Sequence, residues 1–472
     1  MSKKSKQFCA GCAQLRQQLE SLQIQSRQLQ EQVRLLQEQL AQAKKDSSTS
    51  SKPPSSDIVQ PPKPPPADGA EQRAPGGQPG HPKHERLLLP PTQVFDHVPP
   101  CCPRCGGIVQ PTDQPLLVCQ QIEVEMPPLH VIEHRSHAAH CPHCQHVGYA
   151  AWPLPIRQGG MLGPTLTTLV AYLKGVCHAS LSTIRKFFRD VVGLTISRGE
   201  IRKVLQRVSN ALAGPYDELL QALPEQACLN VDETGHKENG QQLWTWCFRA
   251  SLYTLFKIDK RRSADVLIEV LGEEFEGVLG CDYFGAYRRY MRECGVLLQF
   301  CLAHLIRDVK FLLTLPDKRD VAYGSRLLEA LRGLFGVIHE KEQLSARSFK
   351  KRLAAARETV LRVATSDVPA TRHSQRLAKR FVEFGESYVR FVTTPGVEPT
   401  NNLAEQAIRF VVLDRHVTQG TRSAKGRSWC ERIWTAIATC SQQGRSIWEY
   451  LSQAVTAYVS GEASPSLLPQ SE

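Results

Sequence analysis

Leucine recurs at every seventh residue from Leu15 to Leu36 in the N-terminal part of the chain. The positions four residues after each of these leucines are also apolar, except for Ser26. A seam of this kind favours a parallel two-stranded coiled coil, in which a polar seam residue helps to fix the register. The flanking positions are Arg16 and otherwise Gln, so charge contributes little to the choice of partner. We predict a coiled-coil (leucine zipper) arm over residues 1–45 that joins two copies of the chain; a single solvated Gln-rich helix is the alternative.

The apolar periodicity stops after this arm, and residues 46–80 are dominated by Ser, Pro and Gly. A segment of this composition buries too little apolar surface to order itself. We therefore expect a disordered linker that tethers the arm at a distance from the body.

Two Cys-x-x-Cys pairs, Cys102/Cys105 and Cys141/Cys144, follow the linker, each with a proline in its turn. Four thiolates in this arrangement satisfy the tetrahedral preference of Zn²⁺. We predict a structural zinc ion and a zinc-ribbon-like DNA-binding domain over residues 81–150. Four reduced, buried cysteines are the alternative.

The spacer between the two pairs is longer than a usual ribbon loop, and its β-branched runs predict strands at 116–126 and 130–136. A third pair, Cys9/Cys12, has no second pair close to it in sequence, so its role stays open. Substitute zinc ligands lie beside the main pairs: Cys101, His140 and His143.

Helical periodicity returns after residue 150. The expected helices are 163–176, 180–192 and 197–213. The third begins with a capping box, Ser197 and Glu200, and the turn before it suits a helix-turn-helix. We predict a helix-turn-helix-like DNA-binding segment over residues 151–225, with a solvated basic face as the alternative. The basic residues on its last two helices are Arg185, Lys186, Arg189, Arg198, Arg202, Lys203 and Arg207.

The pattern changes to strands from residue 226. The expected elements are strands at 227–232, 243–250 and 252–258, a helix at 263–271 and a strand at 277–281. The first and fourth strands each end in an acid, Asp232 and Asp282. Three meandering strands, a helix and a fourth strand form the ribonuclease H-like order, which brings these two carboxylates together at one end of the sheet.

Two adjacent carboxylates repel one another unless a cation lies between them. Oxygen ligands select Mg²⁺ or Mn²⁺, and two-metal phosphoryl transfer needs a third acid. The best candidate is Glu405, in the first turn of a helix that Asn402 can cap, with Arg409 one turn further on and within reach of a phosphate. The rivals for the third place are Glu398, Glu233 and Asp414.

Composition narrows the class of partner. The 472 residues include 58 Lys and Arg against 46 Asp and Glu, so the net charge is +12. This balance favours a polyanionic partner, with nucleic acid ahead of acidic lipid. No apolar run approaches the ~18–20 residues of a membrane helix, and we expect a cytoplasmic protein whose sixteen cysteines are not a disulfide framework.

From the zipper to about residue 451 the chain resembles an insertion sequence 66 family transposase, a bacterial DDE recombinase. The resemblance rests on motifs in order along the chain: SKPPSSD at 51–57, GGQPGH at 76–81, the two cysteine pairs, VDET at 231–234, CDY at 281–283, CLAH at 301–304 and EPTNNLAEQAIR at 398–409. It implies that Asp232, Asp282 and Glu405 are the metal-binding triad, with two Mg²⁺ or Mn²⁺ ions. Gln406 departs from the family, which commonly has a basic residue there.

The resemblance also implies a helical insertion between the last two acids. Amphipathic helix patterns fill 301–389, which leaves 226–300 and 390–455 for the α/β ribonuclease H-like core and 456–472 for a flexible tail. The protein is thus expected to be multidomain.

Several further residues have a functional and a structural interpretation. His304 could orient a metal-bound water or a phosphate, or act as a structural hydrogen-bond donor. Asn402 is a helix cap first and a substrate contact second. A basic loop at 420–427 suits a DNA backbone, and its cationic residues are Arg422, Lys425 and Arg427. The expected core tryptophans are Trp429, Trp434 and Trp448.

These observations predict a nucleoid-associated bacterial transposase that binds the terminal inverted repeats of its element. It would cleave at the 3′ ends with Mg²⁺ and join the freed ends to target DNA. A transposase-derived DNA-binding regulator without catalysis and a ribonuclease H-like nuclease without strand transfer are the alternatives. Accessory proteins of the same element are an open question.

Overall fold

The computed structural model describes residues 10–46, 49, 89–95, 104–108, 119–122, 129–140, 142–144 and 146–469. Most of the predicted linker, together with Cys9, Cys102 and Cys141, lies outside these residues. The chain divides into two units, Met1–Pro61 with Ser136–Glu472, and Pro62–Arg135. In the smaller unit, the side-chain amide of Gln120 donates to the carbonyl of Leu89 and accepts from its N–H, at 2.6 and 3.0 Å.

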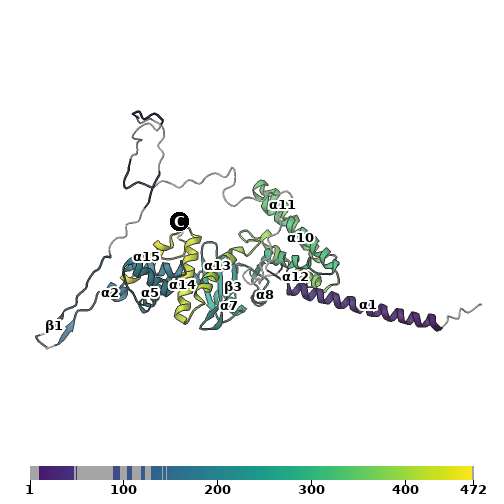
Figure 1. Ribbon diagram of the computed structural model, residues 1–472, viewed down its shortest axis with the longest axis horizontal. Coiled ribbons are helices and arrows are strands. Elements are labelled where there is room, and N and C mark those ends of the chain that lie inside the picture. The colour runs from purple at the N-terminus through teal and green to yellow at the C-terminus, as the bar shows by residue number, and fades with distance from the viewer. Residues whose placement is uncertain are drawn as a thin grey trace, which may run out of the picture. The chain divides into compact units, whose positions relative to one another are not determined.

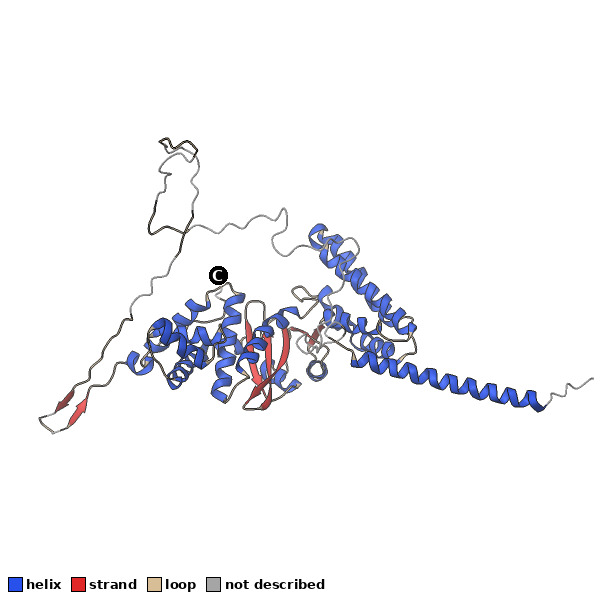
Figure 2. Cartoon of the chain, in the orientation of Figure 1, coloured by secondary structure: helices blue, strands red, loops and turns tan. Residues whose placement is uncertain are grey.

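The larger unit is built around a mixed five-stranded sheet in the order β5-β4-β3-β6-β7. Figure 2 shows the strands as one layer with helices around it. The bounds of the strands are β3 (Cys228–Glu238), β4 (Gln241–Arg249), β5 (Thr254–Asp259), β6 (Val278–Cys281) and β7 (Leu297–Phe300). β3, β4 and β5 are antiparallel, whereas β6 pairs in parallel with both β3 and β7.

The predicted end of the first strand at residue 232 is wrong, because β3 continues to Glu238. Its pairing with β4 runs without interruption to a two-residue turn, Asn239-Gly240, in which both residues have positive φ, 49° and 85°. Asn-Gly in this conformation is the preferred hairpin turn. Asp232 therefore lies inside the strand and not at its end, while Asp282 does follow the last residue of β6.

Helices cover both faces of the sheet and one edge (Figure 1). α13 (Asn402–Thr418) packs on β3 and β4, and the rings of Trp246 on β4 and Tyr287 on α8 (Gly285–Cys294) are in contact across the other face, with centroids 6.3 Å apart. α7 (Ala264–Leu271) packs beside α8.

α14 (Ala424–Gln442) follows the outer edge of β5. The N–H groups of Thr254, Phe256 and Ile258 donate to Thr439 Oγ1, Thr435 Oγ1 and Glu431 Oε1, at 3.2, 3.0 and 2.7 Å. Acceptors four residues apart on a helix match every second N–H of a strand, because both spacings are about 6–7 Å. The edge of the sheet is therefore hydrogen-bonded to a helix.

The helical segment before the sheet has a small core of its own. Its helices are α2 (Leu154–Gly159), α3 (Pro164–Gly175), α4 (Leu181–Phe187) with a π-helical turn (Phe188–Val192), α5 (Arg198–Ala211) and α6 (Ala213–Gln221). Ile184, Phe188, Ile201 and Val204 are fully buried together. The predicted cap of the third helix is confirmed, because Ser197 Oγ accepts from the N–H of Glu200 at 3.0 Å.

The helical pattern predicted for 301–389 is confirmed. Four helices lie there, α9 (Leu302–Leu312), α10 (Lys318–His339), α11 (Ala346–Thr365) and α12 (Arg372–Val389). α12 packs on β7 and on α11. The helices thus extend from the β7 side of the sheet.

The expected flexible tail at 456–472 is instead packed over most of its length. Residues up to Ser460 complete α15 (Ile447–Ser460), and Leu467 is only 1% exposed. Tyr450 Oη donates to the carbonyl of Pro465, and Gln443 Nε2 donates to that of Leu467. The segment is packed because the side chain of Leu467 is buried in the core and the carbonyls of Pro465 and Leu467 accept hydrogen bonds from core side chains.

Two elements lie mostly outside the core. α1 (Ala10–Ala43) is one continuous helix, and β1 (Ala138–His140) pairs antiparallel with β2 (Val147–Tyr149) around the second cysteine pair. No strand forms at 130–136, where one was expected; the strands lie after it. Among the described residues, no helix has the length and apolar content needed to cross a bilayer.

Candidate active site

Two neighbouring parallel strands bring Asp232 and Asp282 to the same level of the sheet. Asn230 on β3 is in register with Gly280 on β6, and each aspartate lies two residues further along its strand direction. Side chains alternate between the two faces of a strand, so Asp232 shares the face of Asn230, which is the face covered by α13. The sequence prediction that these two acids meet is consistent with this register.

Glu405 approaches the same place from the first turn of α13. The pKa of Asp232 is raised well above its ordinary value, first by burial and then by the negative charges of Glu233, Asp282 and Glu405. Three acidic side chains from β3, β6 and α13 therefore act on one another electrostatically.

Asn401 connects the start of α13 to β3, which carries Asp232, and to Cys301 at the start of α9. It is 1% exposed, and its side-chain amide donates to the carbonyl of Val231 at 2.8 Å and accepts from Asn230 at 3.0 Å. Its backbone N–H donates to Cys301 Sγ at 3.2 Å, and its carbonyl accepts from the N–H of Glu405 at 3.1 Å. The first three of these bonds join the start of α13 to residues beside the acidic cluster, and the fourth lies within the helix that carries Glu405.

The expected capping role of Asn402 is wrong. The N-cap position of α13 is Asn401, whose side chain bonds to β3 and caps nothing, while Asn402 is the exposed first residue of the helix. The sequence contains two adjacent asparagines, and only the packing distinguishes the buried one from the exposed one.

Gly280 allows this arrangement. A Cβ at that position would lie 2.5 Å from the side-chain nitrogen of Asn230, which bonds Asn401. Because real Cβ atoms do not approach so closely, any larger residue would displace Asn230. The glycine before Cys281 thus has a packing reason that the sequence alone does not reveal.

Asp282 is held by the turn that follows β6. Its carboxylate accepts from the N–H of Phe284 at 2.8 Å. Burial and the charge of Glu233 raise its pKa to about 6, against the lowering effects of that hydrogen bond and of Arg262. Burial and neighbouring negative charge both disfavour the ionised carboxylate, and a bound cation would offset both effects.

Glu233, a rival for the third acid, has its carboxylate occupied on the opposite face of the sheet. Tyr287 Oη donates to it at 2.5 Å, and Arg262 donates through two nitrogens, at 2.8 and 3.0 Å. The guanidinium of Arg262 lies over the rings of Trp244 and Phe284, at 4.3 and 4.2 Å. Glu233 therefore serves as a structural carboxylate that adds negative potential to the site.

The other two rivals are also placed unfavourably. Asp414 lies further along α13, where its carboxylate is 3.0 Å from His178 Nδ1. Glu398 is exposed in the loop that precedes α13. Glu233 and Glu405 both raise the pKa of Asp232 and of Asp282, but the carboxylate of Glu233 is already bonded to Arg262 and Tyr287.

His304, on the first turn of α9, lies beside Glu405 rather than at a distance from the acids. Its Nδ1 is 3.5 Å from Glu405 Oε1, and burial lowers its pKa. Cys301, at the N-cap of α9, is 2% exposed, with its sulfur 4.0 Å from the same carboxylate oxygen. Sequence reasoning missed Cys301 and Asn401, although Cys301 stands three residues before a histidine that it singled out.

The acids have the donor chemistry of a Mg²⁺ or Mn²⁺ site, since carboxylate oxygens are the ligands these ions prefer. Asp232, Asp282 and Glu405 are not a group whose oxygens all lie within 4.8 Å of one another; in the described part of the chain, Cys301, His304 and Glu405 are such a group. The donor atoms of the three acids thus fit hard cations. Glu405 belongs both to this group of acids and to the group with Cys301 and His304.

The predicted DNA-contacting residues of the helical segment are largely on its surface. The exposed ones are Arg185, Lys186, Arg189, Arg198, Arg202 and Lys203. Arg198 donates to Ser182 Oγ at 2.7 Å, which ties the start of α5 to α4, and Arg189 pairs with Asp190. Arg207 is half-buried and 3.3 Å from Glu200, so a structural role fits it better than a DNA contact.

The basic loop at 420–427 is attached to the β3–β4 hairpin. Thr421 bonds the backbone of Lys237 and Asn239, at 2.9 Å each, and its hydroxyl is 3.1 Å from the buried His236. Arg427 pairs with Glu238 at 3.4 Å. The exposed cations of the predicted set in this region are Arg409, Arg422 and Lys425.

The remaining predicted residues divide between core and surface. Trp429 and Trp434 are buried as expected, 7% and 2% exposed. Cys105 and Cys144 are exposed, and their pair partners are outside the described residues, so the zinc ribbon stays a prediction.

Comparison with known proteins gives two family matches. A family model described as Transposase IS66 family matches residues 159–428, and one described as Family of unknown function (DUF6444) matches residues 5–87. No curated protein matches the chain. The first match includes all three acids and the helices that separate the last two, and the second includes α1.

Proposed function

The chain belongs to the Transposase IS66 family, and from that premise we propose that it cuts and joins DNA at a site formed by Asp232, Asp282 and Glu405. The single observation that carries this assignment is the strand register that sets Asp232 and Asp282 at the same level of adjacent parallel strands, where the charge of Glu405 from α13 acts on both. The order of three antiparallel strands, a helix and two parallel strands supports a ribonuclease H-like core.

The residues around the acids have distinct tasks in this proposal. Asp232 and Asp282 bind the divalent ions together, and Asn401 holds Glu405 opposite them. Mg²⁺ or Mn²⁺ bound there supplies Lewis acidity to the phosphoryl group and lowers the pKa of a water nucleophile. Arg262 and Tyr287 occupy the carboxylate of Glu233, so that it does not compete for the ions.

The reaction we propose is cleavage at the 3′ ends of the element, followed by transfer of the freed 3′-OH to target DNA. Both steps are in-line phosphoryl transfers, so one acidic site can serve both. No covalent protein–DNA intermediate is needed.

The test uses a labelled duplex that carries one end of the element and a second, unlabelled duplex as target. Wild-type protein with Mg²⁺ is expected to nick the first duplex and to join its 3′ end to the second. Asp232→Asn and Glu405→Gln should lower cleavage by at least about 10³-fold while end binding in a gel-shift assay persists.

Glu398→Gln is the matched control, because it also removes one carboxylate near α13 but lies outside the cluster. Equal losses in Glu398→Gln and Glu405→Gln would contradict the assignment of the third acid. Nicking without joining would identify a nuclease, and end binding without nicking would identify a regulator.

The helical segment and the basic loop supply the DNA contacts in this proposal. Exposed cations on α4, α5 and the loop at 420–427 contact phosphates, which makes end binding salt-dependent. Charge reversal at Arg202 should weaken binding and reduce the salt dependence, whereas Arg207→Gln should first lower stability, because Arg207 is paired and half-buried.

We also propose that α1 forms a parallel coiled coil with a second copy. The seam leucines are exposed, for example Leu29 at 61%, while the opposite side of the helix faces the body. On that side Ala41 packs against the core and Lys45 lies over the ring of Phe311, 3.6 Å from its centroid. The chain's own core therefore leaves the seam uncovered, and a helix from a second copy would cover it.

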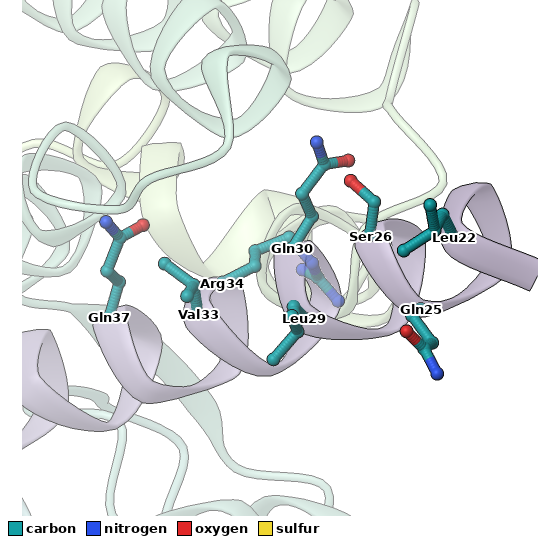
Figure 3. A pocket seen from close by; sticks show the side chains of 8 residues that line it. All are labelled: Leu22, Gln25, Ser26, Leu29, Gln30, Val33, Arg34 and Gln37. Atoms are coloured by element: carbon teal, nitrogen blue, oxygen red, sulfur yellow. The ribbon is translucent and has the colours of Figure 1, made fainter. Parts of the chain in front are cut away.

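Figure 3 shows a hollow on this seam, with Leu22, Ser26, Leu29 and Val33 among the side chains around it. Among the lining residues, Leu22, Gln25, Ser26 and Leu29 have the i, i+3, i+4, i+7 spacing of the hole that receives a side chain of a facing helix in a coiled coil. The hollow arises because Ser26 is small where its seam neighbours are Leu and Val. The polar flanks, which include Gln25, Gln30 and Gln37, suit the boundary of such a seam.

The zinc ribbon remains part of the proposal. The β1–β2 hairpin brackets Pro142–Cys144, as expected for a turn that presents two thiolates. Zinc measured per chain should fall when Cys144 is replaced by Ser, and unchanged zinc content would exclude the ribbon.

A further inference from the structure

The side chains of Cys301, His304 and Glu405 form a cluster that phosphoryl transfer does not require. Cys301 is at the N-cap of α9, His304 is on its first turn, and Glu405 is on the first turn of α13. One donor atom from each lies within 4.8 Å of the other two. Glu405 Oε1 is 3.5 Å from His304 Nδ1 and 4.0 Å from Cys301 Sγ.

The polar atoms of this cluster are incompletely satisfied. His304 Nδ1 is buried and has no hydrogen-bond partner, although it faces the carboxylate. A buried nitrogen left in this state costs about 1–3 kcal/mol. The sulfur of Cys301 is also buried; it accepts from the N–H of Asn401 at 3.2 Å, and its thiol makes only a long bond to Glu405 Oε1, at 4.0 Å. The imidazole nitrogen of His304 and the sulfur of Cys301 thus both lie near Glu405 Oε1.

The spacing suits a tetrahedral metal ion. Zn²⁺ binds sulfur at about 2.3 Å and nitrogen or oxygen at about 2.0–2.2 Å, so its ligands lie roughly 3.5 Å apart. The pairs given above are already at 3.5 and 4.0 Å. The third pair lies within 4.8 Å. Side-chain rotations that close gaps of up to about 1.3 Å would complete a site with three protein ligands and one open position.

The donor set also selects the class of ion. A thiolate and an imidazole favour Zn²⁺, Co²⁺ and similar ions, while Mg²⁺ takes oxygen ligands and avoids thiolates. Glu405 is the one residue common to this cluster and to the proposed catalytic triad. An ion held by Cys301 and His304 would therefore remove Glu405 from the Mg²⁺ site.

We propose that Cys301, His304 and Glu405 bind one thiophilic divalent cation of the Zn²⁺ class, and that its binding inhibits Mg²⁺-dependent DNA cleavage. The proposed metal binding rests on the geometry of the three side chains. The inhibition half rests on the proposed function, because it requires Glu405 to act in catalysis.

The binding test measures zinc stoichiometry and Co²⁺ absorption of the full-length protein. Co²⁺ bound to a thiolate gives a charge-transfer band in the near ultraviolet. Because the predicted ribbon would also bind these ions, the informative quantity is the difference between variants. Cys301→Ser and His304→Gln should each lose one equivalent of metal per chain, along with its share of the Co²⁺ band.

Cys228→Ser is the matched control, since Cys228 is a half-buried cysteine outside the cluster. It should keep the full wild-type stoichiometry. Equal stoichiometry in all three variants and the wild type would overturn the site. His304→Gln provides a second variant if Cys301→Ser does not fold, because His304 retains 14% of its side-chain exposure.

The inhibition test compares each variant with its own zinc-free rate. Micromolar Zn²⁺ should inhibit wild-type cleavage, and the concentration for half-inhibition should rise at least tenfold in His304→Gln. If His304→Gln loses one metal equivalent but its half-inhibiting Zn²⁺ concentration does not rise, the proposed inhibition is wrong and the metal site stands. Metal binding by a protein that cuts no DNA at any Mg²⁺ concentration would count against the proposed function and not against the site.

Discussion

Replacing Asn401 by Ala should destabilise the protein and misplace Glu405 at the same time. The change removes one buried donor and one buried acceptor, and it leaves the carbonyl of Val231 and the amide of Asn230 without their partner. An unsatisfied buried group costs about 1–3 kcal/mol. Asn230 is only half-buried and can recover a water molecule, so we expect the free energy of unfolding to fall by about 2–4 kcal/mol.

The same substitution should lower catalysis beyond its effect on stability. The amide of Asn401 holds the start of α13 against β3, and Glu405 is one helical turn away. A displacement of about 1 Å at a reacting group can cost on the order of 10²-fold in rate. We expect a loss of this order in Mg²⁺-dependent cleavage measured well below the unfolding temperature, where the variant is fully folded.

Asn402→Ala is the control, because the neighbouring asparagine is exposed and makes no contact with β3. Urea denaturation of both variants gives the comparison, and an exposed position should change stability by no more than about 0.5 kcal/mol. If Asn401→Ala unfolds within that margin of Asn402→Ala, the bonding of Asn401 does not hold α13 to β3.

Three further outcomes are expected. Leu29→Lys on the seam of α1 should convert a dimer into a monomer in sedimentation velocity, while Leu35→Lys, also exposed (45% against 61%) but off the seam, should not; a dimer in both would exclude the coiled coil. His236 has its pKa lowered to about 4, mainly by burial, from the ordinary 6.5. Between pH 4 and 6.5, His236 is therefore protonated in the unfolded state and neutral in the folded state. The free energy of unfolding should fall by roughly 3 kcal/mol as the pH drops from 6.5 to 4, and His236→Gln should remove that part of the decline. Parallel pH profiles of the two proteins would contradict this origin. Gly280→Ala should destabilise by about 1–3 kcal/mol because its Cβ meets Asn230, whereas Gly333→Ala, in a helix with open space around it, should stabilise by about 0.4–1 kcal/mol. Thermal melts compare the two, and equal shifts would count against the close contact at Gly280.

Elements with a local signal could be predicted from the sequence. The capping pair Ser197 and Glu200 marks the start of α5 at the right residue, and the acid after β6 follows directly from a short apolar run. The amphipathic pattern between residues 301 and 389 gives four helices. In each of these cases the residues that decide the structure are within a few positions of one another.

Features that depend on distant contacts could not be predicted. The residues of β3 after Asp232 are mostly polar, and their strand conformation comes from pairing with β4 and from Thr421, far along the chain. The short strand β7 was not expected, since its four residues resemble any apolar run after a glycine. The choice between Asn401 and Asn402 depends on Asn230 and Val231, which lie 171 and 170 positions away.

The junction at Asn401 also sets the order in which activity can arise during synthesis. β3 and β6 leave the ribosome early, with two acids in place, but the third acid and the amide that holds it follow only after the helices of α9 to α12. α14, which bonds the outer edge of β5, comes later still. Contacts between such distant segments form slowly, because the intervening chain must first be closed into a loop. Under the proposed function, a growing chain is therefore unable to cut DNA until Glu405 has been synthesised and placed. The long separation between the second and third acids acts as a delay, so that the earliest competent molecule is an almost finished one.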